Sequence, residues 1–371
     1  MLRKYRIWDY DFKLVIMIIA ATVIGLFAVG SAQESVLDKQ ILGFIFGFFL
    51  MVVISLFDYS FFLKFYWVLY ILNVLLLLSV HLFGNTVNNA QRWIEIAGIR
   101  FQPSETAKIL LILFYSQYIM VHKDHINTLK HIVLMLLLLF PPLYLIYEQP
   151  ALSTSIVIFI IFCVILFIGG LSYKIIIGVF AVAIPSFVIF LTLVLQPGQK
   201  IINTYQQTRI LAWLQPDKYI NTEGYQQANS IIAIGSGQLF GKGLNNNVIS
   251  SVKNGNFISE PQTDFIFAII GEELGFIGGC VVIVLLLLIA IECIIIAKKA
   301  KDLAGTLISS GMAALIGFQS MINISVATGI MPNTGVTLPF ISYGLTSLVS
   351  LFIGMGFVLN VRLQCVRKYN N

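Results

Sequence analysis

Apolar segments about as long as a membrane is thick recur along the whole chain, and they restrict what it can fold into. A helix needs about 20 predominantly apolar residues to cross the hydrocarbon core of a bilayer. Hydrophobic residues make up 58% of the 371 residues and charged residues only 11%, against about 25% charged in a soluble domain. The sequence therefore predicts an all-α, polytopic membrane helix bundle. Ten spans are expected: Leu14–Ala32, Ile41–Phe57, Phe65–Phe83, Thr106–Val121, His131–Tyr147, Ser153–Leu171, Ile175–Leu195, Phe265–Ile296, Ala304–Thr328 and Phe340–Leu363.

The placement of Lys and Arg predicts the orientation of these spans. With the N-terminus inside, the short outer segments contain only Lys39, Arg92 and Arg100 as basic residues. Because cytoplasmic loops carry the excess of Lys and Arg, both termini are expected in the cytoplasm. The net charge of +6 then reflects the inner leaflet, and no nucleic-acid partner is expected. The first apolar run exceeds the 7–15 residues of a signal-peptide core and is expected to stay as an anchor.

The polar part of the chain is concentrated in one large extracytoplasmic loop, residues 196–263, and in a shorter outer segment, residues 84–105. The chain contains no internal repeat and no linker, so residues 1–371 are predicted to form a single integral membrane domain. The span after the large loop is too long for one crossing, and we expect its start to lie at the interface. The four cysteines have no metal-site spacing and no plausible disulfide framework.

The segment before the fourth span gathers charge at the outer interface. Ser104 is expected to be the N-cap of a helix, and Lys108 follows Glu105 by three residues, so the two share a face and can pair. One interpretation is a capped helix with a neutralising ion pair. The other is that Arg92, Arg100 and Lys108 are cations that hold a pyrophosphate.

An acid, Asp264, stands at the start of the eighth span. An Asp in this position is commonly a helix N-cap, but no Arg or Lys lies within ten residues of it. A partly desolvated carboxylate has a raised pKa and can accept a proton from an alcohol. Glu272 lies about 80° further round the helix and borders the same face, whereas Glu273 points away. These two acids are expected to tie helices together, with Glu272 supporting Asp264.

Two later segments add polar side chains. Gln319 and Asn323 are four residues apart and share a helix face; they are expected either to hydrogen-bond between helices or to support a site. The Pro-interrupted stretch that leads into the tenth span and includes its first residues presents Ser342 and Tyr343. Irregular backbone at membrane depth is tolerated where it lines a cavity.

Several motifs, in order along nearly the whole chain, resemble the SEDS family of shape, elongation, division and sporulation proteins, which includes RodA, FtsW and SpoVE. The short tails at both ends are most similar to the RodA type. The motifs are Arg92–Trp93–Ile94, Phe101–Gln102–Pro103–Ser104–Glu105 with Lys108, Gly224–Tyr225–Gln226, Ala233–Gly237 with Phe240–Gly243, Thr263–Ala268 with Glu272–Gly275, and Leu338–Gly344.

The resemblance implies a peptidoglycan glycosyltransferase in the bacterial cytoplasmic membrane. Such proteins polymerise lipid II, an undecaprenyl-pyrophosphate-linked substrate, on the outer face, with a class B penicillin-binding protein as partner. The family's catalytic Asp corresponds to Asp264. Cationic side chains or a divalent metal, Mg²⁺ or Mn²⁺, would stabilise the leaving pyrophosphate. The substrate-binding candidates are Arg92, Glu105, Lys108, Arg209, Gln226, Lys242, Ser342 and Tyr343, and the supporting candidates are Glu272, Gln319 and Asn323.

The chain departs from the family pattern at three places. Ala151 stands where the family often has Asp, Gln262 stands where it usually has His, and Gly344–Leu345–Thr346–Ser347 replaces a Gly-Gly-Ser-Ser run. Two alternatives to the enzyme follow. A transporter of lipid II fits the broken helices and buried polar residues, and a weakly active scaffold for a penicillin-binding protein fits the loss of the carboxylate at Ala151.

Overall fold

The computed structural model describes residues 9–87, 90–96, 99–149, 151–196, 204–222, 224–244, 251, 255 and 257–365. The helices are α1 Phe12–Ala32, α2 Leu37–Leu56, α3 Tyr59–Leu63, α4 Tyr66–Phe83, α5 Pro103–Val121, α6 Leu129–Glu148, α7 Leu152–Ile168, α8 Tyr173–Val194, α9 Thr204–Leu214, α10 Pro216–Tyr219, α11 Tyr225–Ser236, α12 Ile266–Lys299, α13 Leu303–Ala327 and α14 Leu345–Leu363. A helix coincides with each of the ten expected spans, which confirms the all-α membrane bundle.

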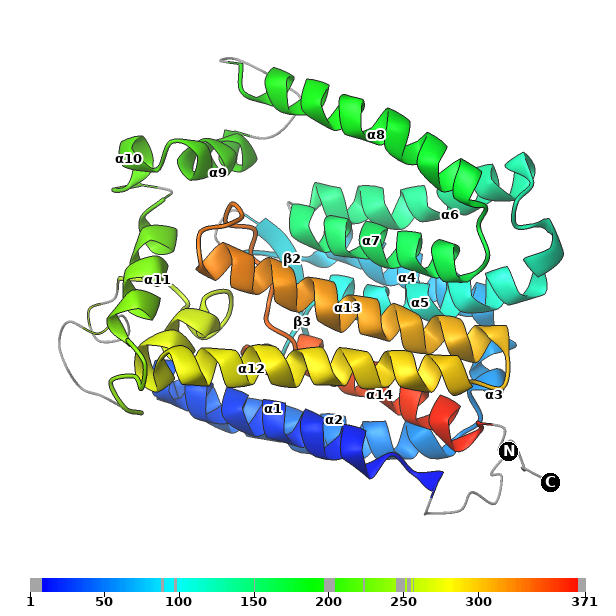
Figure 1. Ribbon diagram of the computed structural model, residues 1–371, viewed down its shortest axis with the longest axis horizontal. Helices are drawn as coiled ribbons and strands as arrows, with labels where there is room; N and C mark the ends of the chain where they lie inside the picture. Colours follow the sequence, from blue (N-terminus) through cyan, green and yellow to red (C-terminus); the bar gives the residue numbers. More distant parts are fainter. Residues whose placement is uncertain are drawn as a thin grey trace.

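The long helices run side by side, with the N- and C-terminal parts of the chain at the same end of the bundle (Figure 1). Within the described residues, seven helices are long and apolar enough to cross a membrane, namely α1, α2 with the turn before it, α4, α6, α12, α13 and α14. The helix α7 is apolar but only 17 residues long. Because large apolar side chains on α2, α4 and α6 are exposed, these helices present their outer faces to lipid.

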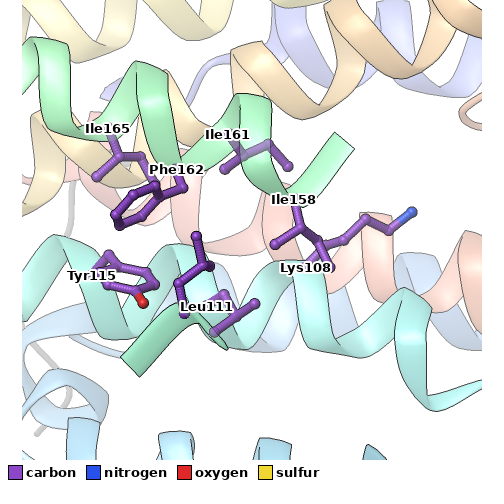
Figure 2. Close-up of a pocket in the computed structure, with 8 residues that line it drawn as sticks. Lys108, Leu111, Tyr115, Ile158, Ile161, Phe162 and Ile165 are labelled. Atoms are coloured by element: carbon purple, nitrogen blue, oxygen red, sulfur yellow. The ribbon is translucent and has the colours of Figure 1, made fainter. Parts of the chain in front are cut away.

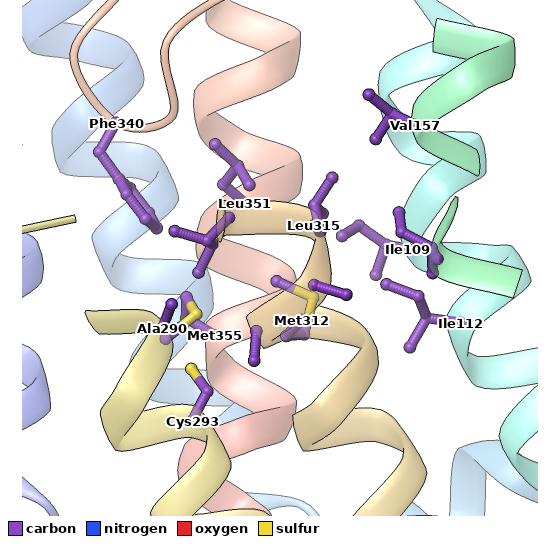
Figure 3. Close-up of a cluster of buried hydrophobic side chains, with 14 of the residues drawn as sticks. Ile109, Ile112, Val157, Ala290, Cys293, Met312, Leu315, Phe340, Leu351 and Met355 are labelled. Atoms are coloured by element: carbon purple, nitrogen blue, oxygen red, sulfur yellow. The ribbon is translucent and has the colours of Figure 1, made fainter. Parts of the chain in front are cut away.

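The core of the bundle is built around α13, which packs against α12, α7, α5 and α14. Apolar side chains from all five helices meet there, including Ile112, Met312, Leu315, Leu351 and Met355 (Figure 3). The α13 sequence is rich in Gly, Ala and Ser. Small residues let helix backbones approach closely in a membrane, where packing replaces the hydrophobic effect as the force between helices.

The helix α12 is interrupted at Gly275, where φ is 68° and ψ is −165°. A residue with a side chain rarely adopts this conformation, whereas glycine adopts it readily. The break leaves residues 266–274 as a short buried helix, followed by a long apolar helix to Lys299. The eighth span therefore begins with a separate segment, and Gly275 is the point of separation. That this segment lies at the membrane interface stays a prediction.

The shorter outer segment forms a small antiparallel sheet, which the sequence analysis did not predict. Its strands are β1 Asn85–Val87, β2 Ala90–Ile96 and β3 Ile99–Phe101, in the order β1-β2-β3. The register pairs Ile94 with Phe101 and Glu95 with Arg100. The sheet packs between α4, α5 and α14 and so places β2 at the end of the bundle that also carries the starts of α5, α12 and α14.

Two expectations about local structure need correction or extension. Ser104 is not the N-cap of α5: the cap position is Gln102, and Pro103 is the first helical residue, a position that proline favours because its missing N–H is not needed there. The large loop is not a single irregular segment, because its described part contains α9, α10 and α11, of which α11 packs against α12. That the chain is one domain stays a prediction.

Candidate active site

Asp264 lies in the connection that leads into the short first part of α12. The cap position of α12 is Phe265, and no side chain in the described part of the chain caps that end, so Asp264 does not have the helix-capping role that its position suggested. Its backbone is held instead, because Asn323 Nδ2 donates to the carbonyl oxygen of Asp264 at 2.8 Å. The preceding carbonyl, that of Thr263, accepts a hydrogen bond from Ser342 Oγ at 2.7 Å. These two hydrogen bonds restrain the backbone at residues 263 and 264.

The groups around this carboxylate have opposite effects on its pKa. Burial raises the pKa of Asp264 above its ordinary value, the positive charges of Arg92 and Arg209 lower it, and the negative charge of Glu260 raises it. The effect of burial is the largest, because desolvation disfavours the charged form of a carboxyl group. Within the described part of the chain, no side chain donates a hydrogen bond to the carboxylate, so its oxygens remain able to accept a proton.

The loop between α13 and α14 brings Gly335 against this group. A Cβ atom at Gly335 would stand 3.2 Å from Asp264 Oδ2 and 3.8 Å from Arg92 Nη1. The carboxylate oxygen and the guanidinium nitrogen are therefore at most about 7 Å apart, and both lie next to a residue without a side chain. Gly335 also has φ of 73°, so the turn that opens this space depends on glycine.

The two arginines reach the site from different elements, and both are anchored. Arg92 lies on β2, and its Nε donates to the carbonyl of Gln149 at 3.0 Å. Arg209 lies on α9, and its Nη1 donates to the carbonyl of Asn333 at 3.3 Å. A guanidinium is planar and always charged, and a backbone contact of this kind orients it within the site.

Gln319 and Asn323 of α13 hold the loop that carries Gly335. Gln319 Nε2 donates to the carbonyl of Thr337 at 2.9 Å, and Asn323 Nδ2 donates to the carbonyl of Val336 at 2.6 Å. Because Asn323 also binds the Asp264 carbonyl, one amide group joins the loop to the start of α12. The predicted shared face of Gln319 and Asn323 is thus confirmed.

Below these amides lies the ion pair that the sequence spacing predicted. Lys108 Nζ is 2.9 Å from Glu105 Oε1 and also donates to Gln319 Oε1 at 2.7 Å. Lys108 is 3% exposed and Glu105 is 7% exposed. The aliphatic part of Lys108 lines a small apolar pocket with residues of α5, α6 and α7, while its nitrogen points away from that pocket (Figure 2). The pair is therefore a buried polar support under the loop.

Four other candidates lie in the surrounding structure. Ser342 Oγ accepts from the Leu338 amide at 2.7 Å and donates to Thr263, and the Tyr343 amide donates to the Gln262 carbonyl at 2.8 Å. Gln226 Nε2 donates to Ser259 Oγ at 2.6 Å. Lys242 is not brought to Asp264: its Nζ lies 2.7 Å from Glu272 Oε1. Whether any of these residues binds substrate stays a prediction.

Two of the residues that depart from the family pattern, Ala151 and Gln262, are buried. Ala151 is 3% exposed and occupies the N-cap position of α7, where no side chain accepts a hydrogen bond. Gln262 is buried, and its Nε2 donates to Glu260 Oε2 at 2.5 Å. The sequence analysis missed Glu260 and Gly335. Glu260 was visible as an acid four residues before Asp264, whereas nothing in the local sequence places Gly335 there.

Among the described residues, His, Cys, Asp and Glu form no group of three or more that could hold a metal ion. Glu260 and Asp264 are two acids at the same site, and their negative charges act on each other. Carboxylate oxygens suit Mg²⁺ and Mn²⁺, which complete their coordination with water and with phosphate groups of a substrate. A divalent cation would accordingly depend on the substrate for most of its ligands.

Residues 8–366 match the sequence profile of the FtsW/RodA/SpoVE family, described as cell cycle proteins. The chain is 36% identical over 294 residues to the Escherichia coli K12 peptidoglycan glycosyltransferase MrdB, covering 79% of this chain and 76% of that protein. It is 32% identical over 381 residues to the probable peptidoglycan glycosyltransferase FtsW of Bacillus subtilis, covering 97% and 92%.

Solved structures are similar over almost the whole length. A chain of a peptidoglycan synthase complex, described as coordinating polymerization and crosslinking, superposes with a TM-score of 0.77 at 27% identity, covering 95% of this chain and 97% of that chain. The crystal structure of the Thermus thermophilus rod shape determining protein RodA superposes with a TM-score of 0.69 at 27% identity, covering 95% and 96%.

Proposed function

The chain belongs to the FtsW/RodA/SpoVE family and is a peptidoglycan glycosyltransferase of the membrane, and we propose that Asp264 is its general base. The observation that carries this proposal is the half-buried carboxylate of Asp264, which lies near Arg92 beside Gly335, feels the charge of Arg209 and has a raised pKa. A base is most effective when its pKa lies near the working pH. Burial moves an aspartate in that direction.

We propose lipid II as the substrate and one proton transfer as the role of Asp264. The 4-hydroxyl oxygen of the acceptor sugar attacks the anomeric carbon of the donor, and its proton passes to the Asp264 carboxylate. The bond from the anomeric carbon to the phosphate oxygen breaks, and the undecaprenyl pyrophosphate leaves with the electron pair. An α-linked donor gives a β-1,4 product by inversion, so one base is sufficient and no covalent intermediate forms.

The leaving group carries the charge that the site has to stabilise. Arg92 and Arg209 face Asp264 from β2 and α9, and arginine matches phosphate oxygens with two parallel donors. We assign the pyrophosphate to these two side chains. Preorganised donors of this kind are worth about 2.7–4 kcal/mol each in transition-state stabilisation when the site excludes water.

The partner and the orientation are part of the same proposal. A chain of a peptidoglycan synthase complex is similar to this one over 95% of its length, and we propose a class B penicillin-binding protein as the crosslinking partner. From the positive-inside bias we propose that Asp264 and the large loop lie on the extracytoplasmic side and both termini in the cytoplasm. The lipid tail of the substrate would remain in the surrounding bilayer.

The test is polymerisation of lipid II by the purified protein together with its penicillin-binding partner. Asp264→Asn keeps the size of the side chain and removes the base, so we expect the rate to fall at least about 100-fold, the lower range for general-base catalysis. Asp217→Asn, at an exposed position of α10, is the matched control and should polymerise like the wild type. Wild-type rates for Asp264→Asn and Asp264→Ala would exclude Asp264 as the base.

A further inference from the structure

The break in α12 at Gly275 is bridged by a separate segment, residues 238–243, which we call the clip. The amides of Lys242 and Gly243 donate to the carbonyls of Glu272 and Glu273, at 2.9 and 3.0 Å. On the other side of the break, the amides of Phe276 and Ile277 donate to the carbonyls of residues 238 and 239, at 2.8 and 3.2 Å. Four backbone hydrogen bonds, two on each side, thus replace those that the helix loses.

The clip lies against α12 backbone to backbone. A Cβ at Gly241 would stand 2.1 Å from the Glu273 carbonyl oxygen, and a Cβ at Gly275 would stand 2.3 Å from the Gly241 amide nitrogen. Neither distance leaves room for a side chain. The angle between the short helix 266–274 and the rest of α12 is therefore set by the clip as well as by Gly275 itself.

One side-chain contact fixes the clip to the short helix. Lys242 Nζ lies 2.7 Å from Glu272 Oε1, with the Lys242 side chain 27% exposed and that of Glu272 3% exposed. A buried carboxylate without its partner costs several kcal/mol, so this ion pair strongly favours one placement of the clip against the helix. It also restrains rotation of the short helix about its own axis.

Asp264 lies in the connection two residues before the short helix begins. From Ile266 to Glu272 the helix rises about 9 Å at 1.5 Å per residue. Residues 266–273 are all buried, so the short helix cannot bend freely in between. A rotation at the Glu272 end therefore moves the Asp264 carboxylate relative to Arg92 and Arg209, which are held by other elements.

We propose that Lys242 is a positioning residue for the glycosyl transfer: through its ion pair with Glu272 it holds the Asp264 carboxylate in register with the two arginines. This inference rests on the proposed role of Asp264. It gives Lys242 a role different from the substrate binding that the sequence analysis expected. A misplacement of about 1 Å can cost 100-fold in rate, so a residue with no contact to the substrate can still control turnover.

The test measures kcat, KM for lipid II and the pH–rate profile for Lys242→Met, Lys242→Arg, Glu272→Gln and the double variant Lys242→Met with Glu272→Gln. Lys218→Met, at an exposed position of α10 in the same loop, is the matched control. We expect Lys242→Met to lower kcat about 10- to 100-fold with little change in KM and with a displaced pH–rate profile. Lys242→Arg keeps the ion pair and should stay close to the wild type.

The double variant separates the two roles. Residues of one ion pair are coupled, so their effects do not add, and we expect the double variant to lose no more activity than Lys242→Met alone. If Lys242 instead contacted the substrate, KM would rise at unchanged kcat and the losses of the two single variants would multiply. That result would overturn the proposal.

A measurement that does not depend on activity tests the position of residue 264 even if the proposed function is wrong. In a variant without native cysteines, Asp264→Cys is labelled with a water-soluble thiol reagent, with and without Lys242→Met. A severalfold change in labelling rate on loss of Lys242 is the expected result, and an unchanged rate refutes positioning. If Asp264→Asn polymerised normally, the proposed function would fail, while the labelling result would still decide whether Lys242 places residue 264.

Discussion

The amide of Asn323 is the point where two parts of the site depend on one hydrogen-bond donor. Its Nδ2 donates to the carbonyls of Asp264, at 2.8 Å, and Val336, at 2.6 Å. The change Asn323→Ala removes both hydrogen bonds without adding bulk. We expect it to separate the α13–α14 loop from the start of α12 and so to lower both stability and turnover.

The magnitude follows from the two carbonyl groups left without a donor. A buried acceptor that loses its partner costs about 1–3 kcal/mol, so two would cost about 2–6 kcal/mol. Asn323 is 1% exposed, but Asp264 is only half-buried, and water can satisfy part of its carbonyl. We therefore expect a loss of about 2–4 kcal/mol in the free energy of unfolding and a kcat at least about tenfold lower, because the carboxylate is no longer held in place.

The assay compares thermal unfolding in detergent and lipid II polymerisation for Asn323→Ala and Ser320→Ala. Ser320 is buried on the same helix, and its Oγ has no hydrogen-bond partner among the described residues, so Ser320→Ala removes no hydrogen bond seen there and serves as the control. Wild-type stability and wild-type kcat for Asn323→Ala would refute the argument that this amide joins the loop to Asp264.

Three further predictions concern the same site. The polymerisation rate should fall as the pH drops through the raised pKa of Asp264, because only the ionised carboxylate accepts a proton. Arg92→Gln removes a charge that lowers this pKa, so it should move the acidic limb of the pH–rate profile to higher pH, and an unmoved limb would contradict the assignment. Gly335→Ala should lower kcat in the same assay, since its Cβ would crowd Asp264 Oδ2 at 3.2 Å and φ of 73° disfavours alanine by about 1–2 kcal/mol; unchanged kinetics would show that the space is not used. Ala151→Asp should raise the thermal unfolding midpoint by capping α7, an effect of about 1 kcal/mol, and a large rise in polymerase rate would favour the scaffold interpretation of the present chain.

The bundle was predictable because bilayer thickness sets the length of each apolar run, independently of how the runs pack. The ion pair of Glu105 and Lys108 was predictable for a similar reason, since residues three apart always share a helix face. The sheet at residues 85–101 was missed, although the alternation in Ala90–Ile96 is a strand signal. The long apolar runs on either side gave a stronger signal than this short alternation.

The meeting of Asp264 with Arg92 and Arg209 could not be predicted from local sequence. The three residues come from different elements, and their distance depends on how α9, β2 and the start of α12 pack together. Lys242 shows the same limit: its charge was visible, but its partner Glu272 is set by a break in a helix. Local chemistry indicated which residues matter, and tertiary packing decided which of them act together.

The clip at Gly275 has a consequence for how such a protein changes in evolution. Every residue carries a backbone carbonyl, and residues 238 and 239 contribute only their carbonyls, so the four bonds across the break do not depend on which side chains stand at residues 238–240. What the junction needs is empty space at Gly241 and Gly275, where a methyl group would collide with main-chain atoms. Substitution at these two positions should be restricted both by size and by their positive φ, so the bend should persist in distant relatives whose surrounding sequence differs.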